Sequence, residues 1–72
     1  MLHNRLKVAR VTFGNLTQQG LAELVGCSRQ TINSIENSKF VPSVALALTI
    51  AKVLEQKLED IFYLQREEDG HS

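Results

Sequence analysis

Four hydrogen-bonding side chains gather on one face of a short helix that the sequence predicts at about residues 28–37. They are Arg29, Gln30, Asn33 and Ser34. Residues three and four positions apart share one side of a helix, so these side chains lie together. A guanidinium binds guanine through two hydrogen bonds, and an amide binds adenine in the same way. The face therefore has the chemistry to read base edges in the major groove of DNA. An ordinary solvated helix face is the alternative, and the residue types alone do not separate the two.

A second predicted helix precedes this one and gives it a surface to pack on. Thr17 is a good N-cap, and Leu21, Leu24 and Val25 form an expected apolar face. Gly26 tolerates the positive φ that ends such a helix. The following helix begins at the N-cap Ser28 and is anchored by Cys27, Ile32 and Ile35. Two short helices joined by such a tight turn, with the small Ala22 at their contact, are typical of a helix-turn-helix.

The remaining segments complete a small all-α fold. Apolar residues at helical spacing predict a first helix at about residues 4–13. Ser43 is the N-cap of a fourth helix over residues 44–54, in which only Thr49 and Lys52 are polar, so we expect it to be buried on most sides. A short fifth helix follows near residues 58–62, and residues 62–65 are expected to form a small strand or an ordered tail.

Composition limits the class of protein. The chain has 72 residues, enough for one small domain. Its formal charge is zero, but residues 1–40 carry a net charge of +3 and residues 41–72 carry −3, so an acidic partner would meet the first half. No apolar run approaches the ~18 residues of a membrane span, and no signal peptide is visible. We therefore expect a cytoplasmic protein with no membrane partner.

Catalytic and metal chemistry have little support. The single Cys27 allows neither an internal disulfide nor a cysteine-based metal site, and His3 and His71 are expected to be exposed. Glu59 and Asp60 are adjacent on a helix and point in different directions, which favours a solvated helix end over paired catalytic carboxylates. The sequence contains no catalytic triad, phosphate-binding glycine loop or cofactor motif. We expect neither an enzyme nor a cofactor.

A family resemblance supports the DNA-reading interpretation. Several residues stand at the spacing of the Cro/C1-type, or XRE, family of helix-turn-helix regulators: Thr17-Gln18, Ala22, Gly26, Ser28-Arg29-Gln30-Thr31-Ile32 and Ile35-Glu36-Asn37. The chain resembles the short, stand-alone members of that family over about residues 4–64. The resemblance implies a five-helix, lambda-repressor-like domain over residues 1–66, with its helix-turn-helix at 18–37. It also implies a small antiparallel sheet that pairs residues near Leu2–Asn4 with Phe62–Gln65. We expect residues 67–72 to be a disordered acidic tail.

The resemblance also implies roles for individual residues. The residues that match the base-reading positions of the family are Arg29, Gln30 and Asn33, with Ser34 at the edge. Its phosphate-contacting positions are Thr17, Gln18, Ser28, Thr31, Asn37 and Lys39. Arg10 and Glu36 match an internal ion pair with a structural role. The segment Phe13–Asn15 is one residue longer than usual, and Gly20 replaces an acidic residue, which removes the capping box from Thr17.

Specific recognition of DNA predicts a dimer. One recognition helix covers too few base pairs for genomic specificity, whereas two copies can read half-sites about one turn apart. We expect an interface formed by apolar residues that exceed what a core of this size can hide: Leu54, Leu58, Phe62, Tyr63 and Leu64.

The resulting hypothesis is a homodimeric, sequence-specific repressor of a pseudo-palindromic operator, controlled by concentration or by a second regulatory protein. The first alternative is an antitoxin-like autoregulator that also binds a protein partner, which an exposed apolar patch at Val11 and Phe13 would favour. The second alternative is a protein-interaction module without DNA binding.

Overall fold

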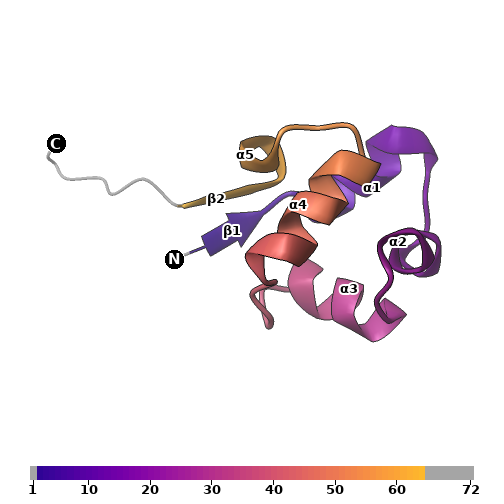
Figure 1. Ribbon diagram of the computed structural model, residues 1–72, viewed down its shortest axis with the longest axis horizontal. Helices are drawn as coiled ribbons and strands as arrows, with labels where there is room; N and C mark the ends of the chain where they lie inside the picture. Colours follow the sequence, from indigo (N-terminus) through magenta and orange to yellow (C-terminus); the bar gives the residue numbers. More distant parts are fainter. Residues whose placement is uncertain (1, 65–72) are drawn as a thin grey trace, which may run out of the picture.

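The computed structural model describes residues 2–64, and the predicted all-α fold with a small sheet is confirmed (Figure 1). In chain order the elements are β1 (Leu2–Asn4), α1 (Leu6–Gly14), α2 (Gln18–Val25), α3 (Arg29–Glu36), α4 (Val44–Val53), α5 (Leu58–Ile61) and β2 (Phe62–Leu64). The predicted pairing of Gln65 and the predicted acidic tail at 67–72 lie outside the described residues. Within the part that is described, no helix is both long and apolar enough to cross a membrane.

Three helices begin at the hydroxyl residues that the sequence indicates. The side chains of Thr17, Ser28 and Ser43 each accept a hydrogen bond from the main-chain N–H three residues later. Each such cap stabilises its helix by about 0.5–2 kcal/mol. Thr17 still accepts from the N–H of Gly20 at 2.9 Å, so α2 lacks only the reciprocal acidic side chain of a capping box.

The core forms where α1, α2, α3, α4 and α5 meet. Its fully buried large side chains are Leu6, Leu21, Ile32, Ile35, Ile50, Leu54 and Ile61. Leu54 is only 2 % exposed and Phe62 only 8 %, so the expectation that this core could not hide them is wrong. Ala22, Ala47 and Ala51 belong to the same core, and side chains as small as these let helices pack closely.

Two predicted apolar faces differ from those in the structure. Helix α4 turns Ala47, Ile50 and Ala51 toward the core, but Val44 is 73 % exposed and Leu48 is 51 % exposed. The prediction that α4 is buried on most sides is therefore wrong for the single chain, because the other elements of the chain cover only one side of this helix. Leu24, expected on the apolar face of α2, is 57 % exposed.

The two ends of the described chain are joined in an antiparallel sheet. The register pairs Leu2 with Leu64, His3 with Tyr63 and Asn4 with Phe62, which confirms the predicted pairing over these residues. The rings of His3 and Tyr63 stack with their centroids 5.7 Å apart. The side-chain amide of Asn4 donates to the main-chain oxygen of Ile35 at 2.9 Å, so the sheet is tied to the end of α3.

Candidate nucleic-acid interface

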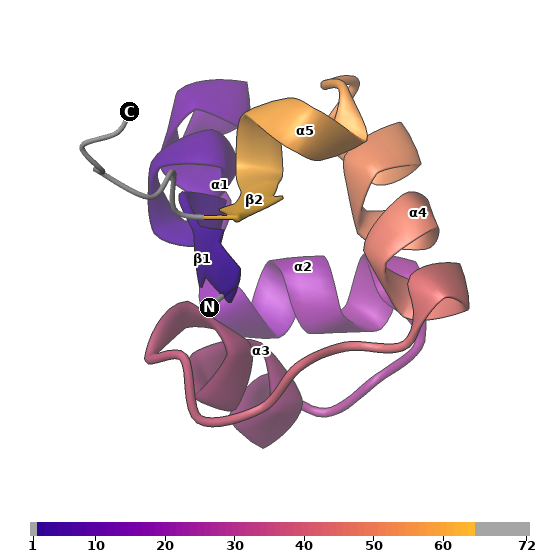
Figure 2. The ribbon, with the colours of Figure 1, turned by 90° about the vertical axis from the view of Figure 1, so that its left-hand side faces the viewer.

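Helices α2 and α3 form the predicted helix-turn-helix. Gly26 ends α2 with φ of +82°, a left-handed conformation, and the N–H groups of Gly26 and Cys27 both donate to the main-chain oxygen of Ala22. Ile32 and Ile35 hold the inner side of α3 in the core. Figure 2 shows α3 at the lower edge of the molecule, with no other helix below it.

The outer side of α3 carries the predicted base-reading residues. Arg29, Gln30 and Asn33 are exposed, and Ser34 is half-buried. A hollow of about 320 Å³ lies between α3 and the loop that follows it. Its lining residues are Ser28, Gln30, Thr31, Ser34, Lys39 and Phe40. The structure therefore brings two predicted base-reading residues, Gln30 and Ser34, close to three predicted phosphate-contacting residues. These three are Ser28, Thr31 and Lys39.

Hydrogen bonds fix the polar side chains at the start of α3. The hydroxyl oxygens of Ser28 and Thr31 lie 2.9 Å apart, and Ser28 Oγ accepts from the N–H of Thr31 at 3.1 Å. The N–H groups in the first turn of a helix favour phosphate oxygens. In the loop, the N–H of Lys39 donates to the oxygen of Ser34 at 2.8 Å, and the Lys39 side chain is exposed.

A buried ion pair braces α3 from behind. Arg10 donates from Nε to Glu36 Oε2 at 2.8 Å and from Nη2 to Glu36 Oε1 at 3.2 Å. Arg10 Nη1 also donates to the main-chain oxygen of Leu16 at 2.7 Å, and Gln18 Nε2 donates to Glu36 Oε1 at 3.0 Å. The two charged side chains are only 10 % and 6 % exposed. The predicted pair of Arg10 and Glu36 is confirmed, and it fixes α3 against α1 and the start of α2.

Two asparagines have contacts that the sequence did not reveal. Asn4 anchors β1 to α3, as described above, and its Oδ1 accepts from the N–H of Leu6 at 3.0 Å. Asn37, at the end of α3, donates from Nδ2 to the main-chain oxygen of Asn33 at 2.9 Å and to Asn33 Oδ1 at 3.2 Å. The spacing of four residues between Asn33 and Asn37 is the feature of the sequence that could have indicated this contact, because amide side chains four residues apart can meet on a helix.

Cys27 is half-buried against the core beside the turn. Burial raises the pKa of the Cys27 thiol above its ordinary value. The neutral thiol is therefore favoured, which fits a packing role for Cys27.

Comparison with known proteins decides the family. The family model described as "Helix-turn-helix" matches residues 7–61. The chain belongs to the XRE family of helix-turn-helix proteins. A Bacillus subtilis relative, named as the uncharacterized HTH-type transcriptional regulator YgzD, is 44 % identical over 66 residues, which cover 92 % of this chain and 98 % of the relative. A Methanocaldococcus jannaschii relative, also named an HTH-type transcriptional regulator, is 48 % identical over 67 residues, covering 93 % of this chain and 100 % of the relative.

A solved structure also resembles this XRE-family chain. It is a crystal structure of a candidate DNA-binding protein from Bacteroides fragilis, with a TM-score of 0.78 and 29 % sequence identity. The match covers 86 % of this chain and 98 % of the other. Within the XRE family, α3 corresponds to the second helix of the motif, the element that enters the major groove in helix-turn-helix proteins.

Proposed function

We propose that this XRE-family protein is a cytoplasmic, sequence-specific DNA-binding regulator that represses transcription as a homodimer on a pseudo-palindromic operator. The observation that carries the proposal is the exposed row of Arg29, Gln30 and Asn33 on the outer side of α3. The buried pair of Arg10 and Glu36 supports it, because a reading helix must be held rigidly from behind. A protein that occupies an operator over a promoter needs no further domain to repress.

The proposed contacts divide into base reading and phosphate binding. Arg29, Gln30 and Asn33 read base edges, with Ser34 at the edge of the contact. The phosphate contacts come from Thr17, Gln18, Ser28, Thr31 and Lys39. Gln18 fits this role because, within residues 2–64, only one of its two amide hydrogens has an acceptor, on Glu36, which leaves the other for a phosphate oxygen. Asn37 is not among these phosphate contacts, because its amide nitrogen already donates to Asn33.

An apolar groove supports the proposed dimer. The groove has a volume of about 520 Å³ and is lined by residues of β1, β2, α5 and the first part of α4. Figure 2 shows these elements from the side on which the two strands lie in front. Its lining residues include the exposed Val41, Val44 and Leu64 and the half-buried Leu58 and Tyr63. Of the five predicted interface residues, we retain Leu58, Tyr63 and Leu64 for contact with a second copy, with Phe62 at the base of the groove. Leu54 is omitted because its side chain is in the core.

The geometry of this groove suits a two-fold dimer. Helix α3 lies at the lower edge of the same view, below β1, β2 and α5, three of the elements that contribute residues to the groove (Figure 2). A two-fold axis that lies in front of these elements and runs along the vertical of Figure 2 would leave both copies of α3 at the same end of the dimer. That arrangement is what two half-sites on one face of a duplex require.

Selection of bound genomic fragments, followed by footprinting at near-physiological salt, tests the proposal. We expect a protected two-fold-symmetric site that overlaps a promoter. Arg29→Ala should weaken operator binding by roughly 1–3 kcal/mol and leave binding to random DNA nearly unchanged. An equal loss on both DNAs would refute the base-reading role of Arg29, and the absence of any enriched site would favour the interaction module without DNA binding.

Sedimentation equilibrium tests the dimer with matched variants. Val44→Asp places a charge in the groove, whereas Val8→Asp places the same charge on α1, at a side chain that is also exposed. We expect the wild type and Val8→Asp to have the mass of two chains at micromolar concentration, and Val44→Asp the mass of one. A wild-type mass of one chain would refute the dimer.

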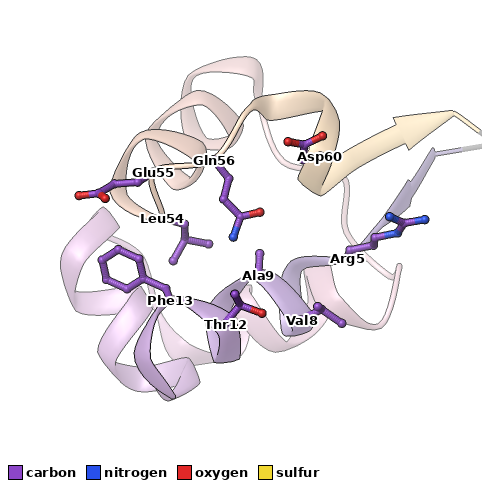
Figure 3. Close-up of a pocket in the computed structure, with 9 residues that line it drawn as sticks. All are labelled: Arg5, Val8, Ala9, Thr12, Phe13, Leu54, Glu55, Gln56 and Asp60. Carbon is purple, nitrogen blue, oxygen red and sulfur yellow. The ribbon is translucent and has the colours of Figure 1, made fainter.

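A second candidate function is an antitoxin-like regulator that also binds a protein. Val11 is 43 % exposed and Phe13 is 41 % exposed. Exposed apolar side chains at these two positions favour a second function in binding a protein. Phe13 also borders a groove of about 660 Å³ between α1 and the segment after α4. Figure 3 shows Val8, Ala9, Thr12 and Phe13 on one side of this groove, facing Gln56 and Asp60 on the other. Under this alternative, Phe13→Asp should abolish capture of a co-encoded protein and leave operator binding intact.

A further inference from the structure

We propose that Asn37 is a positioning residue that turns the side chain of Asn33 so that Asn33 meets DNA as a hydrogen-bond donor. Asn33 then selects a base edge made of acceptors, guanine N7 and O6 or thymine O4. This inference rests on the proposed function, because it assigns a preference to one of the base-reading residues. The juxtaposition that carries it is the pair of hydrogen bonds from Asn37 Nδ2 to Asn33, at 2.9 Å and 3.2 Å.

The orientation of the Asn37 amide is set by a main-chain carbonyl. The oxygen of Asn33 can only accept, so the group that faces it at 2.9 Å must be the amino end of Asn37. An amide nitrogen carries two hydrogens, and the second is directed to the side chain of Asn33 at 3.2 Å. Two amino ends facing each other would repel. Asn33 must therefore turn its Oδ1 toward Asn37.

The same constraint determines what Asn33 offers to DNA. With Oδ1 held by Asn37, the Nδ2 of Asn33 is directed away from Asn37. Among the described residues 2–64, Asn33 Nδ2 has no hydrogen-bond acceptor, and the side chain is exposed on the outer side of α3. An asparagine that reads adenine uses its oxygen and its nitrogen together. Asn33 presents chiefly its nitrogen, which complements the acceptors of guanine or thymine.

Selection of bound sequences from a randomised DNA library, with wild type and four variants, tests the proposal. Asn33→Ala identifies the base pair that Asn33 reads, because preference should be lost there alone. Asn37→Asp keeps the shape of the side chain but removes both donors, and Asn37→Ala removes the side chain entirely. Lys39→Ala is the control, since it changes a nearby proposed phosphate contact without touching Asn33. Circular dichroism melts check that each variant is folded.

The wild type should prefer one orientation of the identified base pair by roughly 5- to 150-fold over the reversed pair, in which the strand that Asn33 reads presents the major-groove amino group of adenine or cytosine. Both Asn37 variants should reduce that discrimination at this base pair at least about fivefold and preserve the preference at every other position. Asn37→Asp should move the preference toward the reversed base pair, which places adenine or cytosine on the strand that Asn33 reads, because a carboxylate draws the amino end of Asn33 inward. Lys39→Ala should weaken all sequences equally and change no preference.

The outcomes separate this inference from the proposed function. A purely structural role for Asn37 would lower the melting temperature and weaken binding to all sequences equally, with the preference at the Asn33 base pair unchanged. That result would overturn the inference and leave the operator-binding function standing. Failure of the wild type to enrich any sequence would overturn the proposed function, and the inference with it.

Discussion

Removal of the Glu36 carboxylate should strongly destabilise the fold. In Glu36→Ala, the Arg10 guanidinium keeps its hydrogen bond to Leu16 but loses both bonds to its carboxylate partner, in a site where the Arg10 side chain is only 10 % exposed. Loss of one partner from a buried pair costs about 3–5 kcal/mol, because an uncompensated charge remains. Gln18 also loses its acceptor at 3.0 Å.

The size of this loss can be compared with the stability of the whole domain. A domain of 72 residues is typically stable by about 4–11 kcal/mol. Glu36→Ala should therefore remove about a quarter or more of the free energy of unfolding. In a domain of this size, each kcal/mol lowers the midpoint of thermal unfolding by roughly 4–8 °C, so a decrease of more than about 12 °C is expected.

Urea titration followed by circular dichroism measures the effect. The control is the double variant Arg10→Met/Glu36→Leu, which removes both charges and fills the site with apolar side chains. Replacement of a buried pair by apolar residues is often neutral or stabilising, so the double variant should recover at least half of the lost stability. Glu36→Ala within about 1 kcal/mol of wild type, or a double variant less stable than Glu36→Ala, would refute the reasoning.

The other predictions concern a turn, a cap, a thiol and a phosphate contact. Gly26→Ala should destabilise by about 1–2 kcal/mol, because φ is +82° and strain arises from the backbone alone, with no atom within 4 Å of the added Cβ; an unchanged urea midpoint would contradict this. Ser43→Ala should cost about 0.5–2 kcal/mol in the same titration, because the N–H of Leu46 loses its acceptor at 3.1 Å. Burial raises the pKa of Cys27, so the folded state favours the protonated thiol. The stability that the protonated thiol contributes is complete below the pKa of Cys27 in the unfolded chain, roughly 8.5, and is lost as pH rises through its higher pKa in the folded protein. The free energy of unfolding should therefore fall above about pH 8.5. It should fall less steeply in Cys27→Ala, which has no thiol at this position. Lys39→Ala should reduce the slope of log K against log salt by about one on operator and random DNA alike, as measured by fluorescence anisotropy.

The elements with strong local signals were predictable from the sequence. The hydroxyl N-caps Thr17, Ser28 and Ser43 and the glycine at position 26 act through neighbouring backbone atoms, so the sequence contains all the necessary information. Helix and turn limits at these positions therefore agree with the structure to within a residue or two. The resemblance added the pairing of the strands and the ion pair of Arg10 with Glu36, which join distant parts of the chain.

Features that depend on tertiary packing were not predictable. Residues 44–54 are apolar on nearly all sides of the helix, so the sequence does not indicate which side of α4 faces the core. Only the arrangement of the other helices shows that Ile50 is buried while Val44 and Leu48 are exposed. The sequence predicts Leu54 at an interface, whereas the structure buries it, because a count of apolar residues does not show how closely alanines let helices approach. In the site, the types of Asn33 and Asn37 were evident, but the hydrogen bonds that orient their amides appear only in three dimensions.

The pairing of β1 with β2 has a consequence for the order of folding. It joins Leu2 to Leu64, whereas α2 and α3 are neighbours in sequence and joined by a short turn. Closing a chain segment costs entropy that grows with its length, so the turn between α2 and α3 can form early and the strand pair only late. The proposed dimer groove is lined by both strands. A nascent or partly unfolded chain can therefore pack α3 against α2 before the groove lined by the strands exists, and we expect unfolding to begin with the opening of the two strands.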